Sequence, residues 1–131
     1  MSKLVIYLLV LLNFYCYGKK VFDLNALNTN KNEVDIRVGE EFVVTVPSNP
    51  NYGIEISFVN KDEVSDSLKL IRDAFIPLGN LKNLVGAGGH KYFYFKALKV
   101  TNEAQTLKFA NVRSWEKQTN NPDYTLKVNV Y

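Results

Sequence analysis

The sequence predicts an all-β fold, an antiparallel β-sandwich of about seven strands. Three observations support this class. Short runs alternate apolar with polar residues, which is the pattern of strands that bury one face. Turn-forming residues separate these runs at regular spacing. No stretch has a convincing amphipathic helical pattern, and a chain of 131 residues is long enough for one domain with a real core.

The first 18 residues are predicted to be a secretory signal peptide, which leaves residues 19–131 as the mature domain. Lys3 precedes an apolar run from Leu4 to Leu12, and small residues precede a cleavage site after Gly18. The run is shorter than the ~20 residues of a spanning helix, so we expect no stable membrane insertion after cleavage. An uncleaved anchor at the membrane interface is the alternative. The predicted destination is outside the cell or a lysosome- or phagosome-like vesicle.

Cysteine content and charge exclude several classes of function. Cys16, the only cysteine, leaves with the leader, so the mature domain has no disulfide, no thiol nucleophile and no thiolate metal ligand. The formal net charge of +3 gives no electrostatic case for nucleic acid. His90 is the only histidine and no Ser, Cys or metal-ligand motif accompanies it, so we expect it at the surface. We therefore expect neither an enzyme nor a cofactor.

Four strands are expected in the first half of the domain. A short edge strand at 21–24 is followed by an Asn-rich loop at 25–32. The next three strands show period-two alternation, with their apolar positions at Val34, Ile36 and Val38, then Phe42, Val44 and Val46, then Ile54, Ile56 and Phe58. Gly39-Glu40 turns the chain, and Pro47 stops the strand that follows. Residues 60–67 form a polar connection.

The second half predicts the remaining strands. Residues 68–75 are ambiguous, because their apolar spacing suits a helix or a strand. A long glycine-rich loop is expected at 76–91, and an aromatic strand then runs from Tyr92 to about Val100. Its aromatics are expected to pack in the core and at the sheet edge rather than to form a base-stacking platform. Strands at 106–112 and 126–130 enclose a loop at 113–123.

The turn from Ser48 to Gly53 is the most distinctive local feature. Pro50 fixes one backbone angle, and its asparagines and Gly53 suit the left-handed conformations of tight turns. Such a turn is stiff before binding and presents Tyr52 at its tip. From this stretch alone, it is either an ordinary hairpin loop or a loop that enters a partner's cleft.

Three unusual loops are expected at one end of the sandwich. Successive antiparallel strands reverse direction, so alternate loops share an end. Counted from the Gly39-Glu40 turn, the second loop contains 49–53, the fourth 86–89 and the sixth 113–115. Loops that cluster in this way on a rigid scaffold are typical of a binding surface.

Together these loops resemble the chagasin family of cysteine-protease inhibitors, over most of the chain from Val38 to Val130. The motifs that carry the resemblance are Val38-Gly39-Glu40, then Asn49-Pro50-Asn51-Tyr52-Gly53 for Asn-Pro-x-x-Gly, Gly86-Ala87-Gly88-Gly89 for Gly-x-Gly-Gly, and Arg113-Ser114-Trp115 for Arg-Pro-Trp. Each motif alone is weak, but the three loop motifs occur in this order and spacing behind a secretory leader. Two positions depart from the family pattern: Asn51-Tyr52 often is Thr-Thr, and Ser114 replaces a proline.

The resemblance implies an immunoglobulin-like fold and reversible, non-covalent inhibition of papain-like, cathepsin-like peptidases by a monomer in a 1:1 complex. The loop at 49–53 would cover the catalytic Cys and His, the glycine loop would follow the non-primed groove, and the loop at 113–115 would contact the primed side. The expected protease-binding residues are Asn49, Pro50, Asn51, Tyr52, Gly53, Gly86, Ala87, Gly88, Gly89, Arg113 and Trp115.

Other roles stay open for these residues at the sequence level. Trp115 lies close to a strand end and would suit the core as well as an interface hot spot. The glycines would suit a flexible linker, and Arg113 a solvated surface charge. The rival function is a secreted immunoglobulin-like adhesion or ligand-binding module with no protease target.

Overall fold

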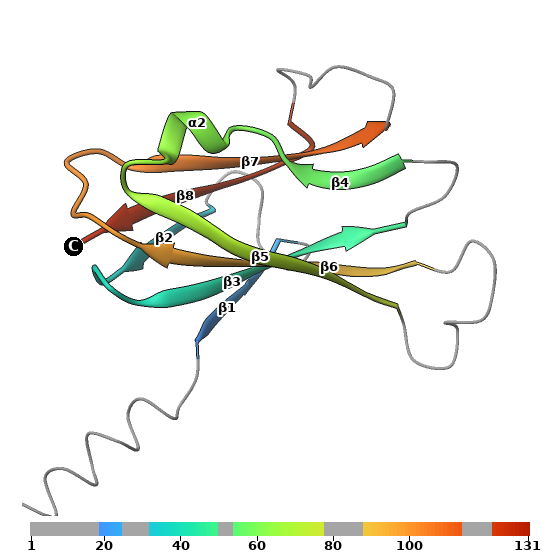
Figure 1. Cartoon of the computed structure of the whole chain (residues 1–131), viewed down its shortest axis with the longest axis horizontal. Helices are drawn as coiled ribbons and strands as arrows, with labels where there is room; N and C mark the ends of the chain where they lie inside the picture. The colour runs from blue at the N-terminus through green and yellow to red at the C-terminus, as the bar shows by residue number, and fades with distance from the viewer. Residues whose placement is uncertain (1–18, 25–31, 50–53, 78–87, 114–121) are drawn as a thin grey trace, which may run out of the picture.

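Two four-stranded sheets pack face to face in the computed structural model, which describes residues 19–24, 32–49, 54–77, 88–113 and 122–131 (Figure 1). The first sheet has the strand order β1-β3-β6-β5, and the second has the order β2-β8-β7-β4. The chain crosses from the first sheet to the second after β1, after β3 and after β6. The predicted all-β sandwich is confirmed.

The eight strands have the following bounds. The first sheet consists of β1 (Lys20–Asp23), β3 (Glu41–Ser48), β6 (Gly89–Ala97) and β5 (Leu68–Pro77). The second consists of β2 (Glu33–Ile36), β8 (Tyr124–Val130), β7 (Gln105–Arg113) and β4 (Ile54–Phe58). Among the described residues the only helix is the single turn α2 (Lys61–Val64), which lies between β4 and β5.

Aromatic rings fill the space between the sheets. Phe42 and Phe95 stack at 5.4 Å within the first sheet, and Phe93 meets Phe109 of the second sheet at 4.8 Å. All four side chains are fully buried. Burial of each such ring stabilises the fold by about 1.5–3 kcal/mol, so this cluster is the main force that joins the two layers.

Strand β6 separates its aromatics by type. Phe93 and Phe95 point into the core, whereas Tyr92 and Tyr94 are half-buried on the outer face. The Arg72 guanidinium of the neighbouring strand β5 stacks over the Tyr94 ring at 3.9 Å. The aromatic strand therefore packs the core on one face and the sheet surface on the other, as the sequence predicts.

The sheets are mixed rather than wholly antiparallel. Strand β1 pairs with β3 in parallel, and β2 pairs with β8 in parallel, while the other strand pairs are antiparallel. Both parallel partners are edge strands, and the segment at 25–31 that connects β1 to β2 lies outside the described residues. Alternation of side chains reports which face is buried but not strand direction, so the pattern could not distinguish these cases.

The ambiguous stretch at 68–75 is strand β5. It pairs with β6 from Leu68–Ala97 to Pro77–Gly89, with an irregularity between Leu70 and Arg72 that accounts for its broken alternation. This pairing also shortens the loop predicted at 76–91, because both of its ends belong to strands. In β2, by contrast, the strand stops at Ile36, and Val38 is exposed in the turn.

Candidate functional site

Strand ends of both sheets meet at one end of the sandwich, which we call the loop end and define by Ser48, Ile54, Pro77, Gly89 and Arg113. In the first sheet Gly89 pairs with Ser48 on one side and with Pro77 on the other. In the second sheet Ile54 pairs with Arg113. The flanks of all three predicted loops therefore lie at the same end, as Figure 1 shows on its right-hand side.

The sheets are joined at the loop end by Lys91. Its ammonium lies 2.5 Å from Oε1 of Glu55 and donates a 3.0 Å hydrogen bond to the carbonyl oxygen of Ile56. Lys91 belongs to β6 and points inward, in register with Val46 and Phe75. Its partners belong to β4, so these bonds cross from one sheet to the other.

Gly89 is required by the packing of the strands beside it. A Cβ placed at this position would collide with the carbonyl oxygen of Ile76, and would lie 2.8 Å from the Cα of Pro77 and 2.9 Å from the Phe75 ring. Gly89 is accordingly buried. At Gly88, by contrast, a Cβ would meet only the Ser48 carbonyl oxygen at 3.7 Å. The fold explains the glycine at 89, whereas the glycine at 88 is not needed for packing.

Four of the predicted binding residues fall within the described part of the chain. Asn49 and Arg113 are exposed, Gly88 is half-buried and Gly89 is buried, and all four lie at the loop end. The others lie outside the described residues, and their binding roles stay predictions: Pro50, Asn51, Tyr52, Gly53, Gly86, Ala87 and Trp115.

The Lys91–Glu55 pair was not among the predicted site residues. The sequence carried one signal for this pair. Lys91, Phe93 and Phe95 lie on the same face of a strand, so the lysine side chain is expected to point toward the core with the two rings. The position of Glu55 gives no comparable signal, because it lies between Ile54 and Ile56 as a surface residue of a half-buried strand would. Its side chain is 61% exposed.

His90 lies at the base of the glycine loop on the outer face of the first sheet. It is half-buried and pairs with Pro47 and Ile76. Within the described ranges, no group of three or more His, Cys, Asp or Glu side chains is arranged to hold a metal ion. In the same part of the chain, no helix is long and apolar enough to cross a membrane.

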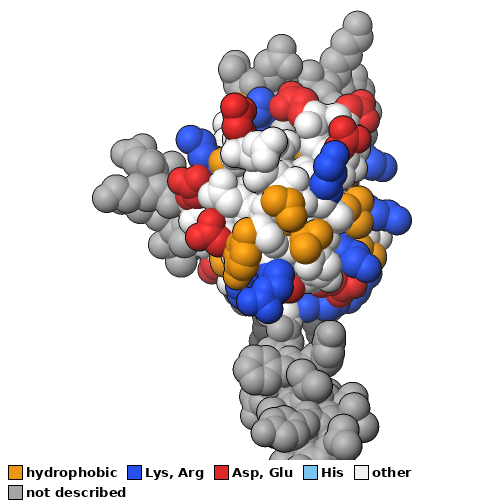
Figure 2. Space-filling model, turned by 90° about the vertical axis from the view of Figure 1, so that its left-hand side faces the viewer, with side chains coloured by type: hydrophobic (Ala, Val, Ile, Leu, Met, Phe, Trp, Pro, Cys, Tyr) orange, Lys and Arg blue, Asp and Glu red, His pale blue; other side chains and the backbone are white. Residues whose placement is uncertain are grey.

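The opposite end of the sandwich, which we call the far end, is closed by backbone bonds. Val38 N donates to Tyr131 O and Gly39 N to Ala97 O, both at 2.8 Å, and Thr101 N donates to Val130 O at 3.0 Å. Figure 2 views the molecule from this side and shows apolar side chains surrounded by charged ones. The exposed apolar residues of this end are Val38, Leu98, Val100 and Tyr131.

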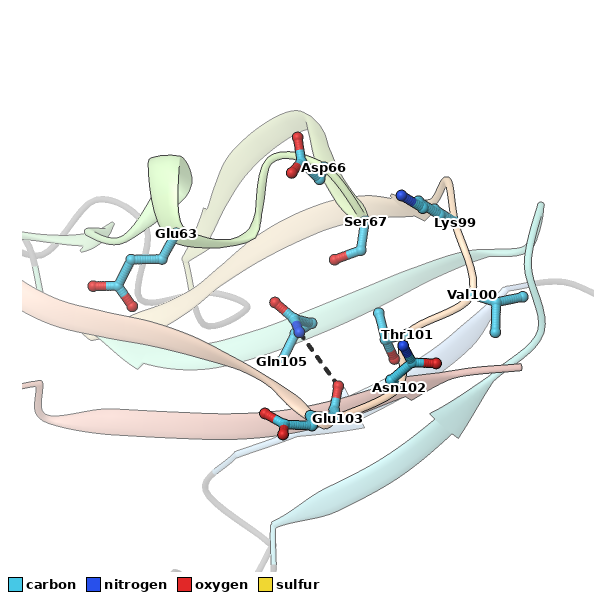
Figure 3. A pocket seen from close by; sticks show the side chains of 9 residues that line it. All are labelled: Glu63, Asp66, Ser67, Lys99, Val100, Thr101, Asn102, Glu103 and Gln105. Carbon is cyan, nitrogen blue, oxygen red and sulfur yellow. Dashed lines mark hydrogen bonds between the residues drawn. The ribbon is translucent and has the colours of Figure 1, made fainter.

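Beside the far end lies an open depression between α2 and the segment that joins β6 to β7 (Figure 3). Its lining is mainly polar and includes Glu63, Ser67 and Lys99. Gln105 donates a hydrogen bond to the Glu103 carbonyl oxygen at 3.3 Å across its lower edge. No convergent set of polar groups faces a single point there, so we assign it no function.

Two exposed glutamates away from the loop end have perturbed acidity. A hydrogen bond from the Lys19 ammonium, at 2.9 Å, and its charge lower the pKa of Glu41. A hydrogen bond from the Asn60 amide and the charge of Lys108 lower the pKa of Glu63. These carboxylates stabilise the fold rather than perform chemistry, because each is already satisfied by a neighbour.

Comparisons with known proteins agree with this architecture. The family model "Chagasin family peptidase inhibitor I42" matches residues 35–130. The crystal structure of the cysteine protease inhibitor EhICP2 from Entamoeba histolytica is similar, with a TM-score of 0.56 and 20% identity over 85% of this chain and 92% of that chain. The solution structure of amebosin has a TM-score of 0.55 and 19% identity over 87% and 99% of the two chains. No curated protein matches significantly.

A β-sandwich in which three loops leave the same end is a scaffold suited to a binding surface made of loops. Because the family model spans nearly all of the domain, the chain belongs to the chagasin family of peptidase inhibitors. The resemblance seen in the motifs is thereby confirmed, and the function is that of a peptidase inhibitor. The two structural likenesses independently support the fold.

Proposed function

We propose that the protein inhibits papain-like cysteine peptidases reversibly, as a monomer in a 1:1 complex, by placing the three loops of the loop end in the active-site cleft. The observation that carries this proposal is the convergence of the loop flanks, where Gly89 joins Ser48 to Pro77 and Ile54 pairs with Arg113. Asn49 and Arg113 are exposed there. One of the two similar structures is that of a cysteine protease inhibitor, which agrees with this class of target.

The mechanism is steric. An interface of ordinary size buries about 1,600 Å² in total, which matches what three neighbouring loops can cover. Strand pairing fixes the ends of the loops before binding, which lowers the ordering cost that binding has to overcome. The chain supplies no thiol after leader removal and acts as neither an enzyme nor a substrate in this proposal.

Titration of the mature chain, residues 19–131, against papain tests the proposal. We expect inhibition that is stoichiometric at high enzyme concentration, is reversed by dilution and leaves the inhibitor uncleaved on a gel. No inhibition of papain or of a panel of cathepsin-like enzymes at micromolar protein would refute it. That result would favour an immunoglobulin-like adhesion or ligand-binding module instead.

We also propose that residues 1–18 direct the chain into the secretory pathway, with a destination outside the cell or in a lysosome- or phagosome-like vesicle. Basic Lys3, the apolar run that follows and the small residues before the cut support this. Mass spectrometry of the purified protein should find Lys19 as the first residue. Microscopy of a tagged chain should separate the two destinations, and diffuse cytosolic signal would contradict the proposal.

A further inference from the structure

We propose that Lys91 is a positioning residue for inhibition: its buried ammonium, held by Glu55 and Ile56, sets the distance between the bases of two inhibitory loops. This inference rests on the proposed function, because it assigns Lys91 a role in that same loop end. It adds a residue that none of the family motifs contains.

The position of the pair in the two strands is the first argument. Lys91 is two residues after Gly89, where the chain leaves the glycine loop and enters β6. Glu55 is one residue after Ile54, where the chain leaves the 49–53 loop and enters β4. The 2.5 Å contact between them therefore joins the bases of these two loops directly. It does so across the sandwich, where no strand pairing links the two sheets.

The burial of Lys91 is the second argument. Within the described residues it is the only charged side chain that is buried, with 5% of its surface exposed, and its ammonium lies 5.4 Å from the Phe93 ring centroid. A buried ammonium is costly to desolvate, and an apolar residue of similar size is often as stable or more so. Stability alone therefore gives a weak reason for a lysine here. A defined geometry between β4 and β6 is the stronger one.

The consequence for inhibition follows from edge-strand position. β4 is the outermost strand of its sheet, and its one neighbour is β7. Lys91 gives the start of β4 directional contacts to the first sheet, whereas the apolar packing between the sheets is non-directional. Without these contacts, the 49–53 loop could shift against the glycine loop. A partner would have to order the two again, which weakens binding without unfolding the domain.

The decisive comparison uses two matched pairs of variants. Lys91→Met keeps the length of the side chain and removes its charge, and Glu55→Gln removes the partner's charge at an exposed position. Lys108→Met and Glu63→Gln do the same to an ion pair of 3.5 Å that lies away from the loop end. For each variant the inhibition constant against papain is measured at a temperature at which the protein is fully folded, together with the melting temperature.

We expect Lys91→Met to raise the inhibition constant about tenfold and Glu55→Gln about threefold, as for the loss of preorganisation. The Lys108 and Glu63 variants should stay within about twofold of the wild type, including any whose melting temperature falls as far. In the double variant Lys91→Met/Glu55→Gln the two effects should not add, because both remove one link. Unchanged inhibition by folded Lys91→Met and Glu55→Gln would overturn the inference, as would equal losses in the control pair.

Hydrogen exchange tests the Lys91–Glu55 link independently of inhibition, so failure of this inference can be told from failure of the proposed function. If wild-type protein inhibits no papain-like enzyme, the proposed function fails, but hydrogen exchange still tests the link. The amides of β4 and of the first residues of β6 should exchange faster in Glu55→Gln than in Glu63→Gln. Equal exchange in the two variants would show that the pair does not hold the strands. If Lys91→Met fails to fold, the exposed Glu55→Gln variant decides both measurements.

Discussion

The two ends of this sandwich are held by different means. At the far end, backbone bonds join the turn at Val38-Gly39, the chain terminus at Tyr131 and the segment at 98–101, and the ion pairs nearby are exposed. At the loop end, the buried Lys91 ammonium joins the sheets among the described residues, and Gly89 lies where the chain has no room for a side chain. The far end therefore depends on backbone hydrogen bonds, whereas the loop end depends on the identity of particular residues.

This difference between the two ends shows at which positions the fold determines the choice of residue. At the other positions of the loop end we infer that binding determines it. Backbone bonds at the far end tolerate many side chains, because the bonds do not depend on them. At the loop end, Gly89 is required by packing and Lys91 is held by Glu55 and Ile56, while Gly88 has space that the fold does not use. Residues that the fold leaves unexplained at this end are the ones we assign to binding.

The largest expected effect concerns Gly89. Gly89→Ala would force its Cβ against the backbone of β5, and we expect a loss of about 2–3 kcal/mol in the free energy of unfolding. At the far end, Gly39→Ala faces no neighbour within 4 Å, and only its φ of +89° costs about 1 kcal/mol. Urea unfolding of both variants measures the contrast. Equal losses would mean that the β5 backbone gives way at Gly89.

The second prediction concerns Trp115, the only tryptophan of the chain. Trp115→Ala should weaken inhibition of papain by about 2 kcal/mol or more, as for an interface hot spot, and leave the melting temperature close to that of the wild type. Inhibition assays and thermal unfolding check both halves. Unchanged inhibition by a destabilised domain would place the tryptophan in the core instead.

The third prediction separates Gly88 from its neighbour. Gly88→Leu should leave stability within about 0.5 kcal/mol, because a Cβ there meets only the Ser48 carbonyl oxygen at 3.7 Å and Gly88 is half-buried at the edge of the described residues. It should weaken inhibition by about 1 kcal/mol or more, since a bulky side chain keeps the partner's backbone away. Stability lost with affinity unchanged would make this glycine structural.

The smallest expected effect is the acid response of the region away from the loop end. The folded-state pKa of Glu63 is lowered, so its contribution to stability is complete above the ordinary glutamate pKa of about 4.3 and is lost as the pH falls through the lowered value. Glu63→Gln should therefore reduce the loss of stability between neutral and acid pH without changing inhibition at neutral pH. Melting curves across this range measure it, and an unaltered slope would contradict the assignment.

Much of the fold was predictable because most strands bury one face. The alternation around Phe42, Phe93 and Phe109 located β3, β6 and β7 to within a few residues. β5 was less certain, because the irregularity after Leu70 disrupts its alternation. The parallel direction of the β1 and β2 pairings and the single turn of α2 carried no periodic signal.

The position of the candidate site at one end of the sandwich was predictable from the sequence. The Lys91–Glu55 contact that joins the two sheets there was not. Strand reversal alone placed the loops at one end, and the motifs gave the family. The Lys91–Glu55 link depends on how two sheets pack, and a lysine in an aromatic strand is more often at a sheet surface. Whether a lysine is buried among partners or solvated is decided by tertiary structure, and local patterns do not contain that information.

The parallel pairing of β1 with β3 determines at which end of the sandwich β1 begins. Lys20 aligns with Phe42 at the start of β3, and the Tyr131 carbonyl accepts a bond from Val38, so both residues lie at the opposite end of the sandwich from the loop end. A bead, fluorophore or fused protein attached near Lys20 or Tyr131 would lie at the far end, away from the loop end. Such a handle would allow the protein to be immobilised with the loop end turned toward solution.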